Sequence, residues 1–151
     1  MKVVDTKEYV SVLKALTEEG KTVNMKVAGN SMSPFLTHDR DAVCFEKCNR
    51  KLRVGDIVFY QRKNGRYIMH RICKTKPEGF YLIGDAQTEV EGPVEKAQIF
   101  AVVTKVRRNG ICMGPGDFWW EFFEHVWVRI IPLRKPLVAI YAVLCGLRER
   151  K

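Results

Sequence analysis

The chain has 151 residues, of which 26 are Lys or Arg and 17 are Asp or Glu, so its formal net charge is +9. This length predicts one domain, and hydrophobic residues at 46% with charged residues at 28% exclude a disordered or fibrous chain. The positive charge is concentrated in residues 126–151, where six basic residues and one acidic residue give 6 − 1 = +5. Aromatic residues gather beside this tail, and the combination favours a membrane surface over nucleic acid as a partner.

Residues 1–21 are predicted to form a short N-terminal helix. Apolar residues recur at helical spacing within residues 5–19, and Gly20 is typical of a helix end. The face expected to pack on the rest of the protein consists of Tyr9, Leu13 and Leu16. Charged residues interrupt the apolar ones every few positions, so we expect neither a signal peptide nor a membrane-spanning helix here.

Residues 22–113 are predicted to form a β-rich core. Short runs of strand-forming residues are bounded by Gly, Asn, Asp or Pro, and Asn64-Gly65 is typical of a hairpin turn. Several short strands at this spacing predict a mainly β fold, coiled into a partly open, barrel-like sheet. The expected strands cover residues 22–28, 42–45, 56–62, 66–74, 80–83 and 99–106.

Residues 114–151 differ in composition from the core. Gly114-Pro115-Gly116 ends the strand pattern, and residues 117–151 are aromatic, apolar and basic, with Pro132 and Pro136 dividing them. We interpret this part as an amphipathic helical segment in an anionic membrane interface, with Trp and Phe at the headgroups. The alternatives are that its aromatic residues pack back on the sheet or form a dimer interface.

Five cysteines are scattered through the chain, at positions 44, 48, 73, 112 and 145. None forms a Cys-x-x-Cys pair, and no second pair of ligands stands at the spacing of a zinc site. We therefore expect mostly buried free thiols in a reducing compartment, with no metal and no other cofactor. The expected location is peripheral, on the cytoplasmic side of a membrane.

Three short segments carry residues that suit nucleophilic catalysis. Ser31 follows a Gly-Asn turn at the end of a predicted strand, His70 lies in an apolar strand, and Asp85 follows a glycine at another strand end. Each has an ordinary structural explanation when it is taken alone. Together they supply a serine nucleophile, a histidine that can take its proton, and a carboxylate that can orient the histidine.

The order of four motifs resembles type I signal peptidases and their LexA-repressor-like relatives. The motifs are Ser31-Met32-Ser33-Pro34, residues 55–58 (Gly-Asp-Ile-Val), His70-Arg71 and Gly84-Asp85, within a likeness that spans residues 27–106. The His-Arg pair is similar to the endoplasmic-reticulum and archaeal type, whereas many bacterial members use lysine as the base. The resemblance implies a serine endopeptidase that cleaves a leader or signal peptide through an acyl-enzyme.

The resemblance also implies roles for single residues. Ser31 is the expected nucleophile and His70 its general base, which predicts activity that rises through about pH 6–7. Asp85 is the favoured acid, and Glu91, which lies near Glu89, is the alternative.

The same resemblance implies where the substrate and its oxyanion bind. The Ser31 N–H is an expected oxyanion donor. Gly29 stands where many relatives carry a second serine donor, a role that Asn30 could fill. Residues 27–30 are the expected substrate edge, and Met32 is a candidate lining of the pocket.

Two other functions remain open from the sequence. A catalytically weak peptide-binding module would keep the same fold and groove, and the glycine at position 29 is compatible with it. A self-cleaving repressor would need a DNA-binding helix-turn-helix, for which the 21 residues before Thr22 are too few. A nucleic-acid partner is not expected, because the strands lack an alternating aromatic and basic stripe.

Overall fold

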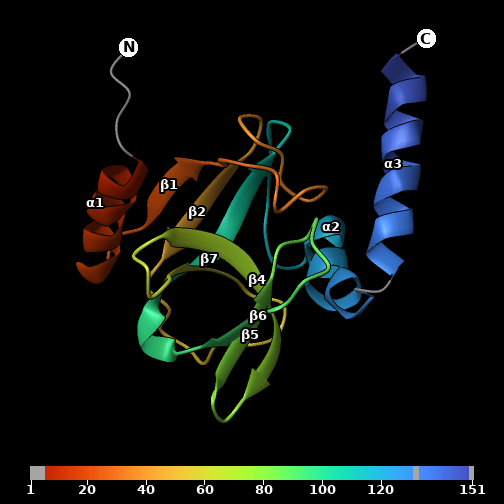
Figure 1. Cartoon of the computed structure of the whole chain (residues 1–151). Helices are drawn as coiled ribbons and strands as arrows, with labels where there is room; N and C mark the ends of the chain where they lie inside the picture. Colours follow the sequence, from red (N-terminus) through yellow and green to blue (C-terminus); the bar gives the residue numbers. More distant parts are fainter. Residues whose placement is uncertain (1–5, 131–132, 150–151) are drawn as a thin grey trace.

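The computed structural model describes residues 6–130 and 133–149 (Figure 1). Helix α1 (Thr6–Glu18) comes first and lies beside β1. The strands that follow are β1 (Val23–Lys26), β2 (Ala42–Glu46), β3 (Ile57–Gln61), β4 (Tyr67–Lys76), β5 (Gly79–Ile83), β6 (Glu91–Val94), β7 (Ile99–Arg108) and β8 (Ile111–Met113). The helical elements after them are α2 (Phe118–Glu121), the turns η2 (Phe122–Val126) and η3 (Trp127–Arg129), and α3 (Arg134–Glu149), while the short η1 (Lys96–Gln98) precedes β7.

The strands form one antiparallel sheet of eight strands. Its order is β1-β2-β7-β3-β4-β5-β6, and β8 pairs with β7. Register shifts in β2, β3, β4 and β5 bend the sheet, because an extra residue on one strand increases the local twist. The sheet coils without closing, as Figure 1 shows. The predicted mainly β, partly open architecture is confirmed.

All six predicted strands exist, and two further strands were missed. The β3–β4 hairpin forms at Asn64-Gly65, where Gly65 has a φ of 89°, as the turn signal predicts. The missed strands are β6, whose sequence includes a glycine and a proline, and the three-residue β8. Glycine and proline disfavour strands intrinsically, so only tertiary pairing makes β6 a strand.

Helix α1 packs on the sheet through a face that differs from the predicted one. Val10 and Leu13 are buried and Leu16 is half-buried, but Tyr9 is 44% exposed, so its assignment to the buried face was wrong. Thr17 completes the inner face, since its hydroxyl donates to the Lys14 carbonyl at 2.7 Å and needs no water. Residue 5, the expected helix start, lies outside the described residues.

The aromatic segment after β8 divides into an inner and an outer part. Phe123 and Trp127 are buried in the main core, where the Phe123 ring packs against Phe35 with centroids 4.7 Å apart, and Val128 is buried beside them in the chain. Phe118 and Trp119 remain exposed. The inner residues therefore follow the alternative in which the aromatic residues pack back on the sheet, and they hold the loop that contains Phe35.

The five cysteines are free thiols, as expected, but none is fully buried: Cys112 is exposed and the other four are half-buried. The expectation of mostly buried thiols was wrong. Within residues 6–130 and 133–149, no helix is both long and apolar enough to cross a membrane.

Candidate functional site

Ser31 lies in a tight loop that begins where β1 ends. Gly29 adopts a φ of 83°, which favours glycine, and its N–H donates to Nδ1 of His38 at 2.7 Å. Ser33 N–H donates to the Asn30 carbonyl at 3.1 Å, which closes the turn around Ser31. Met32 points into the core and is only 1% exposed, so it anchors the loop while Ser31 stays half-buried at the surface of a cavity.

His70 lines the same cavity. It lies on β4 opposite Val58 of β3 and is 5% exposed. Ser31 and His70 both line a cavity of about 290 Å³. The rest of its lining comes from the end of β1 and the loop after it, from the start of β4, and from Arg62 and Gln87.

The start of β4 offers an open strand edge to this cavity. Tyr67 to His70 pair with β3, whereas β5 pairs only from Arg71 onward. Within the described residues, one side of β4 before Arg71 is therefore without a partner strand. Such an edge exposes backbone N–H and C=O groups that an extended peptide can pair with.

The turn that follows β5 supports the loop that contains Ser31. Ala86 N–H donates to the carbonyl of Ser31 at 2.9 Å. A Cβ placed on Gly84 would lie 2.4 Å from the same carbonyl oxygen, so only glycine allows this approach. From the aromatic segment, Trp127 Nε1 donates to the Asp85 carbonyl at 2.8 Å. The turn after β5 thus joins the loop that contains Ser31 to η3.

Asp85 itself does not contact His70. Both of its carboxylate oxygens accept hydrogen bonds from Arg71, from Nε and Nη2, each at 2.9 Å. Both side chains are buried, and the third Arg71 donor, Nη1, bonds to the Gly55 carbonyl at 2.8 Å. The favoured acid of the sequence analysis is thus held in an ion pair on the face of β4 opposite the one that carries His70.

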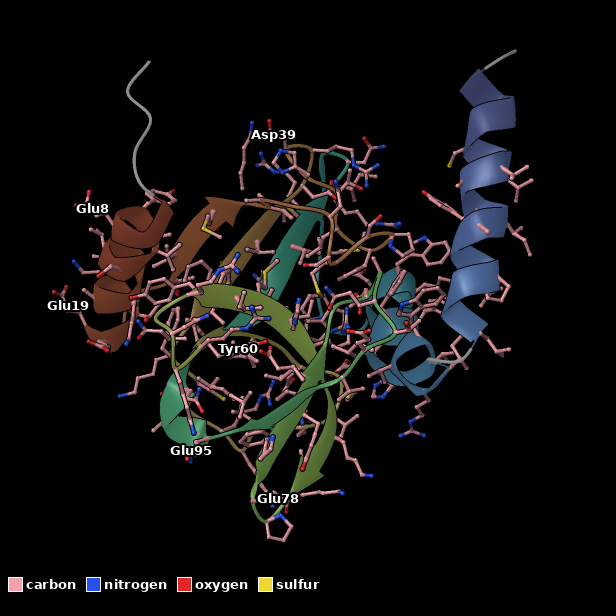
Figure 2. The ribbon with its side chains drawn as sticks, in the orientation of Figure 1. Glu8, Glu19, Asp39, Tyr60, Glu78 and Glu95 are labelled. Atoms are coloured by element: carbon pink, nitrogen blue, oxygen red, sulfur yellow. The ribbon has the colours of Figure 1, made fainter. Side chains whose placement is uncertain are left out.

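The structure instead brings Glu91 close to His70 through Tyr60. The Tyr60 hydroxyl lies 3.4 Å from His70 Nδ1 and donates a short hydrogen bond to Glu91. Arg62 holds the same carboxylate, with Nε 2.6 Å from one oxygen. Tyr60 is fully buried inside the coil of the sheet, where Figure 2 labels it. Sequence reasoning missed Tyr60, although a buried tyrosine needs a partner for its hydroxyl.

Burial sets the charge state of these groups. It lowers the pKa of His70 to about 4, and the negative charges of Glu91 and Asp85 only partly oppose this. Burial alone would raise the pKa of Glu91, but hydrogen bonds from Arg62 and Tyr60 hold it below its ordinary value. Burial and the bond to Glu91 raise the pKa of Tyr60, so its hydroxyl stays protonated. His70 is therefore a neutral imidazole at pH 7 beside an ionised carboxylate.

Two backbone N–H groups at Ser31 are available to an acceptor. Within the part of the chain that the structure describes, neither Ser31 N–H nor Met32 N–H donates a hydrogen bond. The Gly29 N–H is occupied by His38, and Asn30 Oδ1 accepts from the His38 N–H at 3.4 Å. In the same described residues no hydrogen bond joins Ser31 to His70 in the free protein, a contact that often forms only when substrate is bound.

A second cavity, of about 500 Å³, adjoins the first. His70, Arg62 and Gln87 belong to its lining, and Glu89 and Glu91 form its acidic side. His70 therefore contributes to the lining of both cavities.

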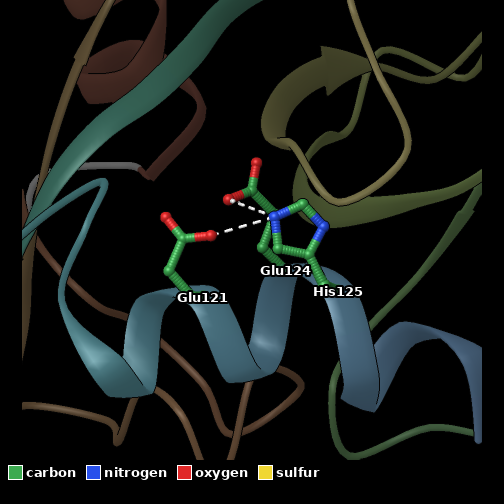
Figure 3. A group of neighbouring side chains, drawn as sticks. All are labelled: Glu121, Glu124 and His125. Carbon is green, nitrogen blue, oxygen red and sulfur yellow. Dashed lines mark ion pairs between the residues drawn. The ribbon is translucent and has the colours of Figure 1, made fainter.

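One group elsewhere has the residue types of a metal site. Glu121, Glu124 and His125 lie together on α2 and η2, with His125 Nε2 2.9 Å from Glu121 and 3.6 Å from Glu124 (Figure 3). The imidazole therefore already has two carboxylate partners. Glu124 also packs against Gly55, where an added Cβ would lie 2.5 Å from its Cγ, so this group supports the turn before β3.

The fold and the site define a class: a coiled antiparallel β protein of the serine peptidase-like type. Residues 1–106 match the family described as Peptidase S24-like, and the chain belongs to this family. No curated protein and no solved structure matches it. The family places the chain in the superfamily that contains LexA-like serine peptidases, whereas the histidine-type signal peptidase subtype stays a prediction.

Proposed function

We propose that this protein is a serine endopeptidase in which Ser31 is the nucleophile and His70 the general base. The observation that carries the proposal is that both residues line one cavity beside an open strand edge. Within the described residues His70 and Arg62 are the only basic side chains of that cavity, and no lysine belongs to its lining. An arginine stays protonated at any ordinary pH, which leaves His70 as the group that can accept a proton.

The tautomer of His70 follows from its neighbours. Because the Tyr60 hydroxyl donates to Glu91, its lone pair is available to a proton on His70 Nδ1. A neutral imidazole with its proton on Nδ1 leaves Nε2 free to accept the proton of Ser31. Ser31 Oγ then attacks the scissile carbonyl, and His70 returns the proton to the leaving amine as the acyl-enzyme forms. Water, activated by the same imidazole, releases the acid product.

We assign the acid of this site to Glu91 acting through Tyr60, rather than to Asp85. Glu91 is an ionised carboxylate that the Tyr60 hydroxyl links to His70. The charge of Glu91 raises the pKa of His70, and so stabilises its imidazolium, more than the charge of Asp85 does. Asp85 has both oxygens bonded to Arg71. Tyr60 is then a positioning residue that holds His70 in one tautomer.

The substrate we propose is an extended peptide, such as a leader or signal peptide, that adds a strand between the start of β4 and residues 27–32. Backbone pairing would supply affinity there, and side-chain pockets would supply specificity. Val27, Ala28 and Met69 make part of the wall apolar. Small apolar residues at the cleavage site suit this wall.

The first experiment is a cleavage screen against a peptide mixture, read by mass spectrometry, with wild type, Ser31→Ala and His70→Gln. Both variants are expected to lose most turnover and to a similar extent, because the two groups act as a unit. Ser33→Ala is the matched control: it removes a hydroxyl two residues away in the same half-buried loop and is expected to retain activity. Cleavage that survives Ser31→Ala would contradict the assignment of the nucleophile.

The role of Tyr60 predicts a second result. Tyr60→Phe is expected to lower kcat by about 10- to 100-fold, the equivalent of one hydrogen bond to a charged network. Glu91→Gln removes the charge that raises the pKa of His70, so the acidic limb of the pH–rate profile is expected to move to lower pH. An unchanged limb in Glu91→Gln would argue against the assignment of the acid.

A peptide-binding module is the alternative function, and one observation favours it. The N–H of Gly29 is already bonded to His38, and this position has no hydroxyl to assist an oxyanion. In that case peptides would be retained equally by wild type and Ser31→Ala, and neither would cut them. The same screen therefore separates the two functions.

A further inference from the structure

Helix α3 has an apolar surface that the rest of the protein does not cover. The sequence has no charged residue from position 136 to 147. Leu137, Ile140, Tyr141 and Leu144 recur at spacings of three and four residues, so they share one face, and they are between 39% and 59% exposed. Figure 1 shows α3 standing at the side of the molecule, away from the sheet. A helix with such a surface is stable in water only when something covers it.

Charge indicates what covers this surface. Arg134 and Lys135 begin α3, and Arg148, Arg150 and Lys151 lie at its end or follow it, so basic residues flank the apolar part on both sides. The body of the protein adds to this charge. A hydrogen bond with Cys145 and burial raise the pKa of Tyr141, and the nearby guanidinium groups of Arg108 and Arg40 oppose that rise. Basic residues thus flank the apolar helix in the sequence, and Arg108 and Arg40 lie near Tyr141 in the structure.

Two aromatic residues of the preceding segment are exposed as well. Phe118 is 73% exposed and Trp119 is 45% exposed, while their neighbours Phe123 and Trp127 are buried in the core. The Arg108 guanidinium lies 5.4 Å from the Trp119 ring centroid. Aromatic rings beside cations are typical of groups that lie at the level of lipid headgroups.

We propose that α3, together with Phe118 and Trp119, binds the surface of an anionic lipid membrane. The helix lies along the interface, because basic residues at both of its ends are then close to headgroup phosphates while the apolar face enters the acyl region. Since Phe123 and Trp127 tie the same segment to the loops of Ser31 and Asp85, the bound protein would hold its groove close to the membrane. This inference does not depend on the peptidase chemistry.

Co-sedimentation of the full chain with lipid vesicles tests the proposal. The probes are vesicles of phosphatidylcholine mixed with phosphatidylglycerol, and vesicles of phosphatidylcholine alone. Wild type is expected to bind the anionic vesicles and to bind the neutral ones far more weakly. Each basic residue near the surface contributes about fivefold to the affinity, so raising the salt from about 0.1 to about 1 M should release most of the protein.

Matched variants distinguish binding through α3 from non-specific binding through any exposed apolar residue. Ile140→Glu combined with Leu144→Glu places two charges on the apolar face, and the vesicle-bound fraction is expected to fall at least about tenfold. The control combines Val12→Glu with Ile111→Glu, which changes two equally exposed apolar residues on α1 and β8. It is expected to bind as wild type does, and so is Ser31→Ala.

Three outcomes would overturn the proposal. Wild type that stays in the supernatant with anionic vesicles, or an equal loss in both double variants, would show that α3 is not the membrane-binding element. Sedimentation equilibrium without lipid gives the third. A dimer that Ile140→Glu with Leu144→Glu converts to a monomer, in a protein that does not bind vesicles, would make this face an interface between two copies of the chain.

Discussion

Replacing Asp85 by asparagine separates a structural carboxylate from a catalytic one. Asp85 is 0% exposed and Arg71 is 2% exposed, and two hydrogen bonds of 2.9 Å join them. Asp85→Asn leaves the guanidinium charge buried without its counter-ion, which typically costs about 3–5 kcal/mol of the free energy of unfolding. In a chain of this size each kcal/mol lowers the melting temperature by about 2–4 °C, so Asp85→Asn is expected to melt about 6–20 °C below wild type.

Glu91→Gln is the comparison for this test. The side chains of Arg62 and Glu91 are 31% and 34% exposed, and ion pairs of that kind contribute at most about 1 kcal/mol. Thermal unfolding followed by circular dichroism should therefore show a large change for Asp85→Asn and a shift of at most about 4 °C for Glu91→Gln. If Asp85→Asn melts with wild type and yet loses all cleavage, Asp85 acts in the reaction, and the argument from the ion pair is refuted.

Two further predictions concern the loop that contains Ser31, and His70. Gly84→Ala places a methyl group against the Ser31 carbonyl, so it is expected to remove most activity and to lower the free energy of unfolding by about 1–3 kcal/mol. In the control Gly114→Ala the added methyl group meets only ordinary contacts at 3.5 Å, so activity and stability are expected to stay unchanged. Equal activities of the two variants would contradict the close approach of Gly84 to Ser31. The pKa of His70 is about 4 in the folded protein and 6.5 for the free side chain, so between these pH values the unfolded state binds more protons than the folded state. The free energy of unfolding therefore falls as the pH falls through this range, by about 3 kcal/mol in all. Denaturant unfolding at several pH values should show this loss in wild type and not in His70→Gln, and an identical slope in both would exclude His70 as its source. The acidic limb of activity is then expected near pH 4, not at pH 6–7 as the sequence alone predicts.

Local patterns explain which parts of the fold could be predicted. The β3–β4 hairpin depends on Asn64-Gly65, whose backbone preference belongs to the two residues themselves. The predicted long strands are confirmed, because branched and aromatic residues are frequent in them. Strand β6 could not be found this way, since Gly92 and Pro93 oppose a strand locally and only pairing with β5 makes one.

His70 and Glu91 could be named from the sequence, but Tyr60 and the link that it makes between them depend on distant contacts. Tyr60, Glu91 and His70 lie on three different strands, and only the coil of the sheet brings their polar groups together. The aromatic segment is similar, because its residue types suit a membrane interface and a protein core equally well. Phe123 is core because Phe35 lies beside it, which no local pattern states.

Arg71 explains why the four motifs occur together. Its guanidinium bonds to the Gly55 carbonyl and to the Asp85 carboxylate, and it lies 5.3 Å from the ring centroid of Phe35, four residues after Ser31. One buried side chain therefore joins the turn before β3, the turn after β5 and the loop that contains Ser31 and Phe35. Its neighbour His70 points to the opposite face of β4 because side chains alternate along a strand.

The two residues of each of these motifs have different roles in the structure. In the His70-Arg71 pair, the first residue faces the cavity and the second holds the surrounding loops in place. In Gly84-Asp85, the glycine admits the Ser31 carbonyl and the aspartate neutralises Arg71. Residues that resemble a catalytic acid by their place in a motif can thus be the counter-ion of the scaffold. In this chain the carboxylate linked to the proposed base through Tyr60 is instead that of Glu91, the alternative that the motif order ranked second.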